Sequence, residues 1–148
     1  TRGTSTRTFA ALEVMVCLDT SFVVDFLRGR ADAVNCLTAL QESNEDVVVA
    51  APSVFELVEG AEIAGSLKEK EGIREVLSSL TVLALDTETA WAAGELTASL
   101  IMSGDQIGQM DTLIAAIAKY HGERLLTANV KHFSRIPGLE VEDYTKAR

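Results

Sequence analysis

The sequence contains no long apolar run and very few cysteines. Apolar runs are short, and Val47–Ala51, for example, covers five residues, whereas a membrane-spanning helix needs about 20. A transmembrane protein is therefore excluded. The two cysteines, Cys17 and Cys36, lack the spacing of a zinc-binding pair, and each lies within an apolar pattern. We interpret them as reduced thiols of the core, which excludes the disulfide-rich and structural-zinc classes and favours a cytoplasmic protein.

Positive charge is also scarce. The chain has 13 Lys and Arg against 22 Asp and Glu, which gives a formal net charge of −9. A generic nucleic-acid-binding protein carries an excess of basic residues that displace counterions from the phosphate backbone. Any nucleic acid on which this chain acts must therefore be held by local basic residues or by metal ions.

The 148 residues are enough for one domain with a core of its own, and the 47% of hydrophobic residues excludes a disordered chain. Residues 1–14 are rich in Thr and Arg and precede the first methionine, Met15. We interpret them as a leader or a disordered arm outside the fold. Residues 15–148 are expected to form the single domain.

Short apolar strands alternate with helical patterns along this domain. The strands show no alternation of polar and apolar residues, which is typical of parallel strands buried on both faces. The pattern predicts an α/β fold with a four- to five-stranded, mainly parallel sheet. The expected strands are Val16–Leu18, Asp46–Ala50, Thr81–Leu85, Arg124–Thr127 and a weaker edge segment, Leu139–Glu142. Two helices are expected to start at Thr20 and at Pro52, and others are expected at Asp32–Leu40, Ile73–Leu80, Thr87–Met102 and Met110–His121. The charged segment Ser66–Gly72 is interpreted as a helical extension and a turn.

Acidic or amide side chains follow the strands of this predicted sheet. Asp19 closes the first strand, and Glu56 lies one turn into the helix after the second. Asp111 lies in the first turn of the last long helix, and Asn129 follows the fourth strand. Ligands of parallel sheets bind outside the carboxyl ends of the strands, so we expect the four residues at one edge. Structural roles are open as well: helix capping, a favourable charge at a helix start, a solvated face or an ordinary turn.

Three carboxylates at one edge would repel one another and raise their pKa values. A bound Mg²⁺ or Mn²⁺ removes that repulsion, because both ions prefer oxygen ligands. Such an ion can activate water and clamp a phosphodiester. The residues alone therefore favour metal-assisted phosphoryl chemistry.

Four segments, in this order, resemble the motifs of the PIN-domain ribonuclease family. The third is the most specific, and together they cover nearly all of residues 15–144. The closest resemblance is to the VapC-type subgroup, the toxins of toxin–antitoxin pairs. The segments are Val16–Ser21 (VCLDTS), Ala51–Leu57 (APSVFEL), Ile107–Ala116 (IGQMDTLIAA) and Leu126–Asn129 (LTAN), the last followed by His132 and Phe133.

The resemblance implies a PIN-like, Rossmann-like α/β/α sandwich and a cytoplasmic endoribonuclease that uses Mg²⁺ or Mn²⁺ to activate water. Asp19, Glu56 and Asp111 are the implied metal ligands, and together with Asn129 they form the implied catalytic set. The family often has Asp at the fourth position. Asn129 accepts hydrogen bonds but adds no charge, which leaves one-metal and two-metal sites open. The implied partners are RNA, a small antitoxin whose tail covers the acidic pocket, and a second copy in a homodimer, with no membrane.

Two alternatives of other classes stay open. A PIN fold that has lost catalysis would be an RNA- or protein-binding module. A receiver domain or a haloacid-dehalogenase-like phosphatase also places Asp after the first strand, but the phosphatase pattern requires a second Asp where Ser21 stands. Glu95 is interpreted as solvated or as supporting a neighbouring residue of the site, with metal binding as the alternative. The two histidines, His121 and His132, have no evident partner and are assigned no role.

Overall fold

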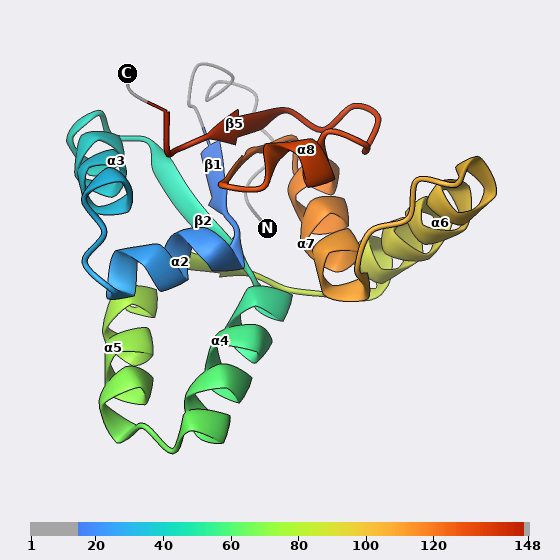
Figure 1. The fold of residues 1–148 in the computed structure, drawn as a ribbon. Helices are drawn as coiled ribbons and strands as arrows, with labels where there is room; N and C mark the ends of the chain where they lie inside the picture. The colour runs from blue at the N-terminus through green and yellow to red at the C-terminus, as the bar shows by residue number, and fades with distance from the viewer. Residues whose placement is uncertain (1–14, 147–148) are drawn as a thin grey trace.

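The computed structural model describes residues 15–146 and contains one five-stranded sheet, in which all the paired strands are parallel (Figure 1). The expected leader, residues 1–14, lies outside the described residues. The strand order is β3-β2-β1-β4-β5, which confirms the predicted parallel α/β sheet. The strands are β1 (Met15–Leu18), β2 (Asp46–Ala50), β3 (Thr81–Leu83), β4 (Arg124–Thr127) and β5 (Val141–Asp143).

Helices connect the strands and cover both faces of the sheet (Figure 1). Among the helices of residues 15–146, none combines the length and the apolar character that crossing a lipid bilayer requires. The helices are α2 (Thr20–Leu27), α3 (Ala31–Glu42), α4 (Ala51–Ala64), α5 (Leu67–Leu77), α6 (Thr87–Ser103), α7 (Gln109–Tyr120) and α8 (Val130–Phe133).

Alternate residues of the central strands pack into two separate cores. On one face, Val16 and Leu18 of β1 pack with buried side chains of α2, α3, α4 and α5. On the other face, Met15 and Cys17 pack with side chains of α6, α7 and the segment around Phe133. Because both faces are buried, both sets of side chains must be apolar, which explains why the strands show no polar alternation.

The order of the strands reverses at β1. The chain proceeds outward from β1 to β2 and β3, and then returns to place β4 on the other side of β1. Leu18, the last residue of β1, is in register with Val49 of β2 and Leu126 of β4. In an open parallel sheet, the crevice at such a reversal is where ligands bind, because the helices on its two sides diverge. The functional site is thus expected at the carboxyl ends of β1 and β4.

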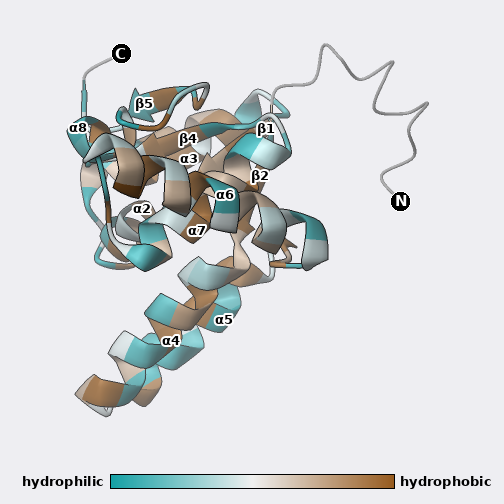
Figure 2. Cartoon of the chain, turned by 90° about the vertical axis from the view of Figure 1, so that its right-hand side faces the viewer, coloured by the Kyte–Doolittle hydropathy of each residue, from teal (hydrophilic) through white to brown (hydrophobic). Residues whose placement is uncertain are grey.

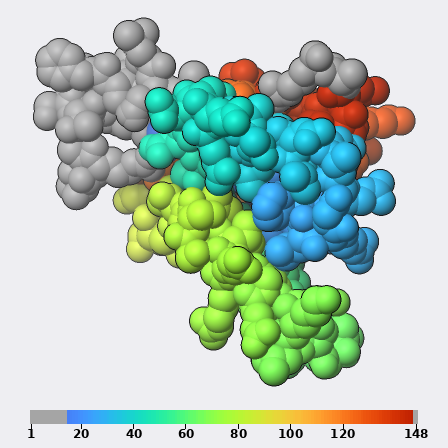
Figure 3. Space-filling model, turned by 90° about the vertical axis from the view of Figure 1, so that its left-hand side faces the viewer, coloured from blue at the N-terminus to red at the C-terminus, as the bar shows by residue number. Residues whose placement is uncertain are grey.

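Helices α4 and α5 form a hairpin that projects from the rest of the molecule (Figures 2 and 3). The sequence analysis expected a helical extension and a turn at Ser66–Gly72. The segment is helical, but the position of the turn was wrong: Ser66 is the N-cap of α5, accepting a hydrogen bond from the Glu69 N–H at 3.1 Å, and the helix continues through Gly72. The turn lies instead at Gly65, which has a left-handed φ of 65°. The residues around Gly72 have high helix propensities, and their combined effect exceeds the low helix propensity of one glycine.

Three smaller differences concern short segments. Strand β3 ends at Leu83 rather than Leu85, because Asp86 caps α6 and the connection must leave the sheet earlier. Strand β5 is the expected edge strand but begins at Val141. The short helix α8 was not predicted, since four residues are too few for a helical period.

Replacing Gly72 with Ala tests whether α5 is continuous. The position is not in the left-handed region, and an added Cβ would meet Leu27 Cδ2 at an ordinary 3.5 Å. We expect Gly72→Ala to raise the free energy of unfolding by about 0.5–1 kcal/mol, because alanine loses less backbone entropy in a helix. Urea unfolding monitored by circular dichroism gives this value.

The matched control is Gly65→Ala in the turn of the same hairpin. Space is open around Gly65, so its left-handed φ of 65° alone decides the effect, and a loss of about 1 kcal/mol is expected. A destabilised Gly72→Ala variant would contradict the continuous helix.

Candidate active site

Asp19 is the buried centre of the site at the strand reversal. It follows β1 directly, is 4% exposed, and donates its backbone N–H to the carbonyl of Leu126 on β4 at 3.1 Å. Its Oδ2 accepts a hydrogen bond from Thr127 Oγ1 at 2.5 Å. Its Oδ1 accepts one from Ser21 Oγ at 2.8 Å and one from the Phe22 N–H at 2.9 Å. Asp19 therefore caps α2, as the structural interpretation proposed, and it also lies where the ends of β1 and β4 meet.

The pKa of Asp19 is raised above its ordinary value. Burial is the main cause; hydrogen bonds from Thr127, Phe22 and Ser21 oppose it, and the negative charge of Asp111 raises it further. Because the charge of Asp111 acts on Asp19, the two carboxylates share one electrostatic environment. A carboxylate has about four lone-pair positions, and the three donors leave Asp19 with capacity for one more ligand.

Asp111 lies in the first turn of α7, where the helix dipole favours a negative charge. Its side chain is 33% exposed, so it borders solvent, whereas Asp19 is enclosed. The Asp111 Oδ2 lies 3.0 Å from Nε2 of His132 on α8. The sequence analysis gave His132 no partner, and the structure corrects this: His132 contacts one of the predicted metal ligands.

Glu56 is held by the start of α2. Thr20, the residue after Asp19, donates from Oγ1 to Glu56 Oε1 at 2.5 Å, and the same Oγ1 lies 3.0 Å from Ser53 Oγ. Ser53 is fully buried in the first turn of α4. Figure 1 shows α2 and α4 beginning where β1 and β2 end. The structure thus places Glu56 beside the residue that adjoins Asp19, at the expected edge of the sheet.

Asn129 follows β4 at the same edge. Its backbone N–H donates to Thr127 Oγ1 at 2.9 Å, so Thr127 connects Asn129 to Asp19. The residue is the N-cap of α8, but its side chain makes no capping hydrogen bond. Asn129 is exposed, and because its side-chain amide does not cap the helix, the amide is available to bind a ligand.

The arrangement fits an ion that retains part of its water. Within residues 15–146, no three His, Cys, Asp or Glu side chains form a group that could hold a metal ion by themselves. Mg²⁺ usually keeps several waters and is bound through one or two carboxylates, whereas structural Zn²⁺ sites need four protein ligands. Asp19 and Asp111 are the two carboxylates that could bind such an ion. Their ligation of it stays a prediction, as does ligation by Glu56.

Two residues near the site were not found from the sequence. One is His132; the other is Tyr144, which follows β5 and donates from its hydroxyl to Asp25 Oδ2 of α2 at 2.6 Å. Tyr144 also packs edge-on against Phe22, with ring centroids 4.6 Å apart. It anchors the end of the edge strand against the helix that Asp19 caps. Both contacts join segments more than 20 residues apart, and no local pattern marks them.

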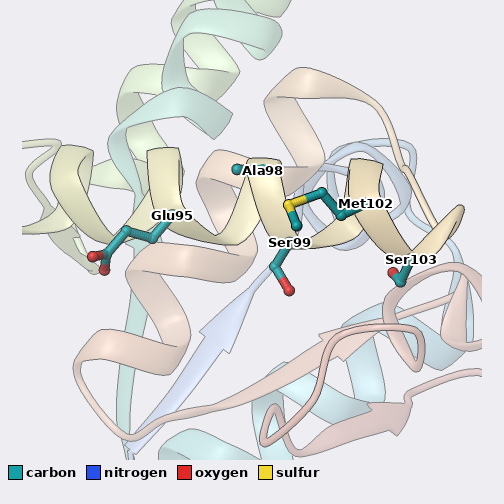
Figure 4. Close-up of a pocket in the computed structure, with 5 residues that line it drawn as sticks. All are labelled: Glu95, Ala98, Ser99, Met102 and Ser103. Atoms are coloured by element: carbon teal, nitrogen blue, oxygen red, sulfur yellow. The ribbon is translucent and has the colours of Figure 1, made fainter.

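Glu95 lies elsewhere, as its interpretation as a solvated residue predicted. It is exposed on α6 and accepts a hydrogen bond from Trp91 Nε1 at 3.1 Å. Figure 4 shows it at one end of a shallow hollow that runs along α6. The hollow is lined by residues of this helix alone: Glu95, Ala98, Ser99, Met102 and Ser103.

Comparisons with known proteins agree with this geometry. The sequence model of the PIN domain family matches residues 16–139. The chain is 34% identical over 127 residues to Ribonuclease VapC19 of Mycobacterium tuberculosis, covering 85% of this chain and 98% of that protein. It is 29% identical over 128 residues to the tRNA(fMet)-specific endonuclease VapC of Salmonella typhimurium, covering 86% and 96%.

Solved structures share the fold over nearly the same range. The crystal structure of VapBC2 from Rickettsia felis, bound to a DNA fragment from its promoter, matches with a TM-score of 0.79 and 28% identity, over 88% of this chain and 98% of that chain. The DNA-bound VapBC of Salmonella typhimurium matches with a TM-score of 0.75 and 29% identity, over 88% and 98%. The family-model match, the identity to VapC ribonucleases and the common fold agree, and the chain belongs to the PIN-domain family, among its VapC-type ribonucleases.

Proposed function

We propose that this protein is an endoribonuclease toxin of a toxin–antitoxin pair, which hydrolyses RNA phosphodiester bonds with the help of Mg²⁺ or Mn²⁺. The observation that carries the proposal is the pair Asp19 and Asp111. Asp19 is buried at the reversal of strand order, it is connected to β4 through Thr127, and it lies within the field of a second carboxylate. Two carboxylates in one electrostatic environment repel each other unless a cation is bound. A metal site therefore explains this pair better than a purely structural role does.

Each residue of the proposed site has a separate task. Asp19 and Asp111 would hold the ion, and Glu56 would contribute a third carboxylate from the α4 side, where Thr20 holds it in place. Asn129 offers an uncharged amide for a hydrogen bond to a water or a phosphate oxygen. When bound, the ion supplies the positive charge that a phosphodiester needs during hydrolysis and makes water more acidic. The uncharged fourth position favours one tightly held ion over two.

The binding-module alternative explains less of the geometry. A protein that only binds RNA or another protein gains nothing from an acid that burial has made harder to ionise. Burying an ionisable carboxylate opposes folding, and such groups are found mainly where function requires them. With a net charge of −9, the chain also lacks the basic surface that a metal-independent RNA-binding module would use.

The remaining partners follow from the relatives and from the surface. The related structures are VapBC complexes, and we propose a cognate antitoxin here, whose basic side chains would suit the acidic edge of the sheet. We also propose a homodimer, since α6 exposes three large apolar side chains, Trp91, Ile101 and Met102. We propose a cytoplasmic location, which the proposed RNA substrate and the two buried free thiols, Cys17 and Cys36, support.

Replacing Asp111 with Asn tests the proposed function. The substitution keeps the shape of the side chain and removes its charge, so we expect RNA cleavage at saturating RNA to fall by about 100-fold or more. Chelation by EDTA should abolish cleavage by the wild type, and added Mg²⁺ or Mn²⁺ should restore it. Cleavage of a labelled RNA, followed on a denaturing gel, gives the rates.

Asp46→Asn is the matched control, because the exposed Asp46 begins β2 and therefore lies at the opposite end of a central strand. This variant should cleave like the wild type. Wild-type cleavage that persists in EDTA, or an Asp111→Asn variant with full activity, would refute metal-assisted hydrolysis at this site.

The stability of an Asp19→Asn variant tests the electrostatic account. Because folding raises the pKa of Asp19, its favourable contribution is fully present at pH values below the ordinary aspartate pKa and is lost as the pH rises through the raised value. Asn does not titrate and caps a helix equally well. In EDTA at pH 7.5, we expect Asp19→Asn to melt about 2–4 °C above the wild type, with a smaller difference at pH 4. A variant that melts below the wild type at pH 7.5 would show that the hydrogen bonds of Asp19 outweigh its charge.

A further inference from the structure

His132 lies next to Asp111 but has no role in the proposed hydrolysis. Its Nε2 lies 3.0 Å from Asp111 Oδ2, and its side chain is 25% exposed. A carboxylate oxygen is only an acceptor, so Nε2 must carry a hydrogen to approach this closely. The contact therefore fixes one of the two oxygens of Asp111. Among residues 15–146, the other oxygen, Oδ1, is left without a contact of this kind, and the charge of Asp111 raises the pKa of Asp19.

The backbone around His132 is firmly anchored. The next residue, Phe133, is 1% exposed within the core that contains α7, and Ile136 is 2% exposed. The rings of His132 and Phe133 meet edge-on, with centroids 5.7 Å apart. A second link joins the same segment to the loop before α7: Arg135 Nη1 donates to the carbonyl of Gln106 at 3.0 Å. The segment at α8 thus contacts both Asp111 and the loop that leads to it.

We propose that His132 is a positioning residue, which holds Asp111 in the orientation that binds the metal ion. Carboxylates that bind metals are commonly fixed by a hydrogen bond to their second oxygen, and loss of such a partner typically lowers metal affinity 10- to 100-fold. Asp111 needs this support more than Asp19 does, because Asp111 is one-third exposed and its carboxylate contacts only His132 among the partners that the structure shows for residues 15–146, whereas Asp19 accepts three hydrogen bonds. The inference rests on the metal site of the proposed function.

The test is the affinity of the RNA-free, full-length protein for Mn²⁺, measured by isothermal titration calorimetry. We expect His132→Ala to bind Mn²⁺ about 10-fold more weakly than the wild type. His132→Gln, whose amide can donate from a similar position, should recover most of the affinity. At saturating Mn²⁺, His132→Ala should cleave RNA with nearly the wild-type kcat and KM. Thermal melting in EDTA verifies that each variant is folded.

The chain's other histidine provides the control. His121 caps the opposite end of α7, ten residues and therefore about 15 Å along the helix from Asp111. His121→Ala should bind Mn²⁺ like the wild type.

Two results would overturn the inference. If His132→Ala leaves the Mn²⁺ affinity unchanged and raises the KM for RNA, His132 contacts the substrate instead; if it changes neither, the contact with Asp111 has no role in the site. The Mn²⁺ affinity of Asp111→Asn distinguishes a failure of the inference about His132 from a failure of the proposed function. If Asp111→Asn also leaves the Mn²⁺ affinity unchanged, the metal site itself is wrong and the inference falls with it.

Discussion

The hydrogen bond between Thr127 and Asp19 is the contact on which the site depends. It connects the ends of β1 and β4, two strands that are neighbours in the sheet although more than 100 residues separate them in the chain. The two residues can meet only because the strand order reverses at β1 and the chain returns to its other side. The same contact holds the Asp19 carboxylate in a buried position, and Thr127 in turn accepts from Asn129. Sheet topology thereby determines the geometry of the acidic edge.

Stability and function make opposite demands on Asp19. As a helix cap it contributes favourably, because its Oδ1 accepts from the Phe22 N–H. As a buried acid near Asp111 it opposes folding in its charged form, which its raised pKa reflects. The hydrogen bonds that Asp19 accepts from Phe22, Thr127 and Ser21 lower its pKa, but they do not fully offset the effect of burial. In the proposed function, a bound cation offsets the remaining repulsion between the two carboxylates. It would also help a protein with a net charge of −9 to approach a polyanion.

The sequence predicted those features that local patterns encode. The parallel sheet, the position of Asp19 after β1 and the position of Asp111 in the first turn of α7 all follow from short segments read in order. The pairing of His132 with Asp111 could not be predicted, because α8 is too short for a periodic signal and the contact depends on how the segment around Phe133 packs against α7. The continuity of α5 through Gly72 was missed for another reason: neighbouring residues outweighed the glycine.

A crystal structure of the protein with Mn²⁺ tests the central claim most directly, because anomalous scattering locates the ion without assumptions about its ligands. The account predicts one strong peak at the carboxyl ends of β1 and β4, about 2.1 Å from an oxygen of Asp19 and an oxygen of Asp111, with the second oxygen of Asp111 still on His132. A strong peak at any other carboxylates, with none between Asp19 and Asp111, would contradict the account.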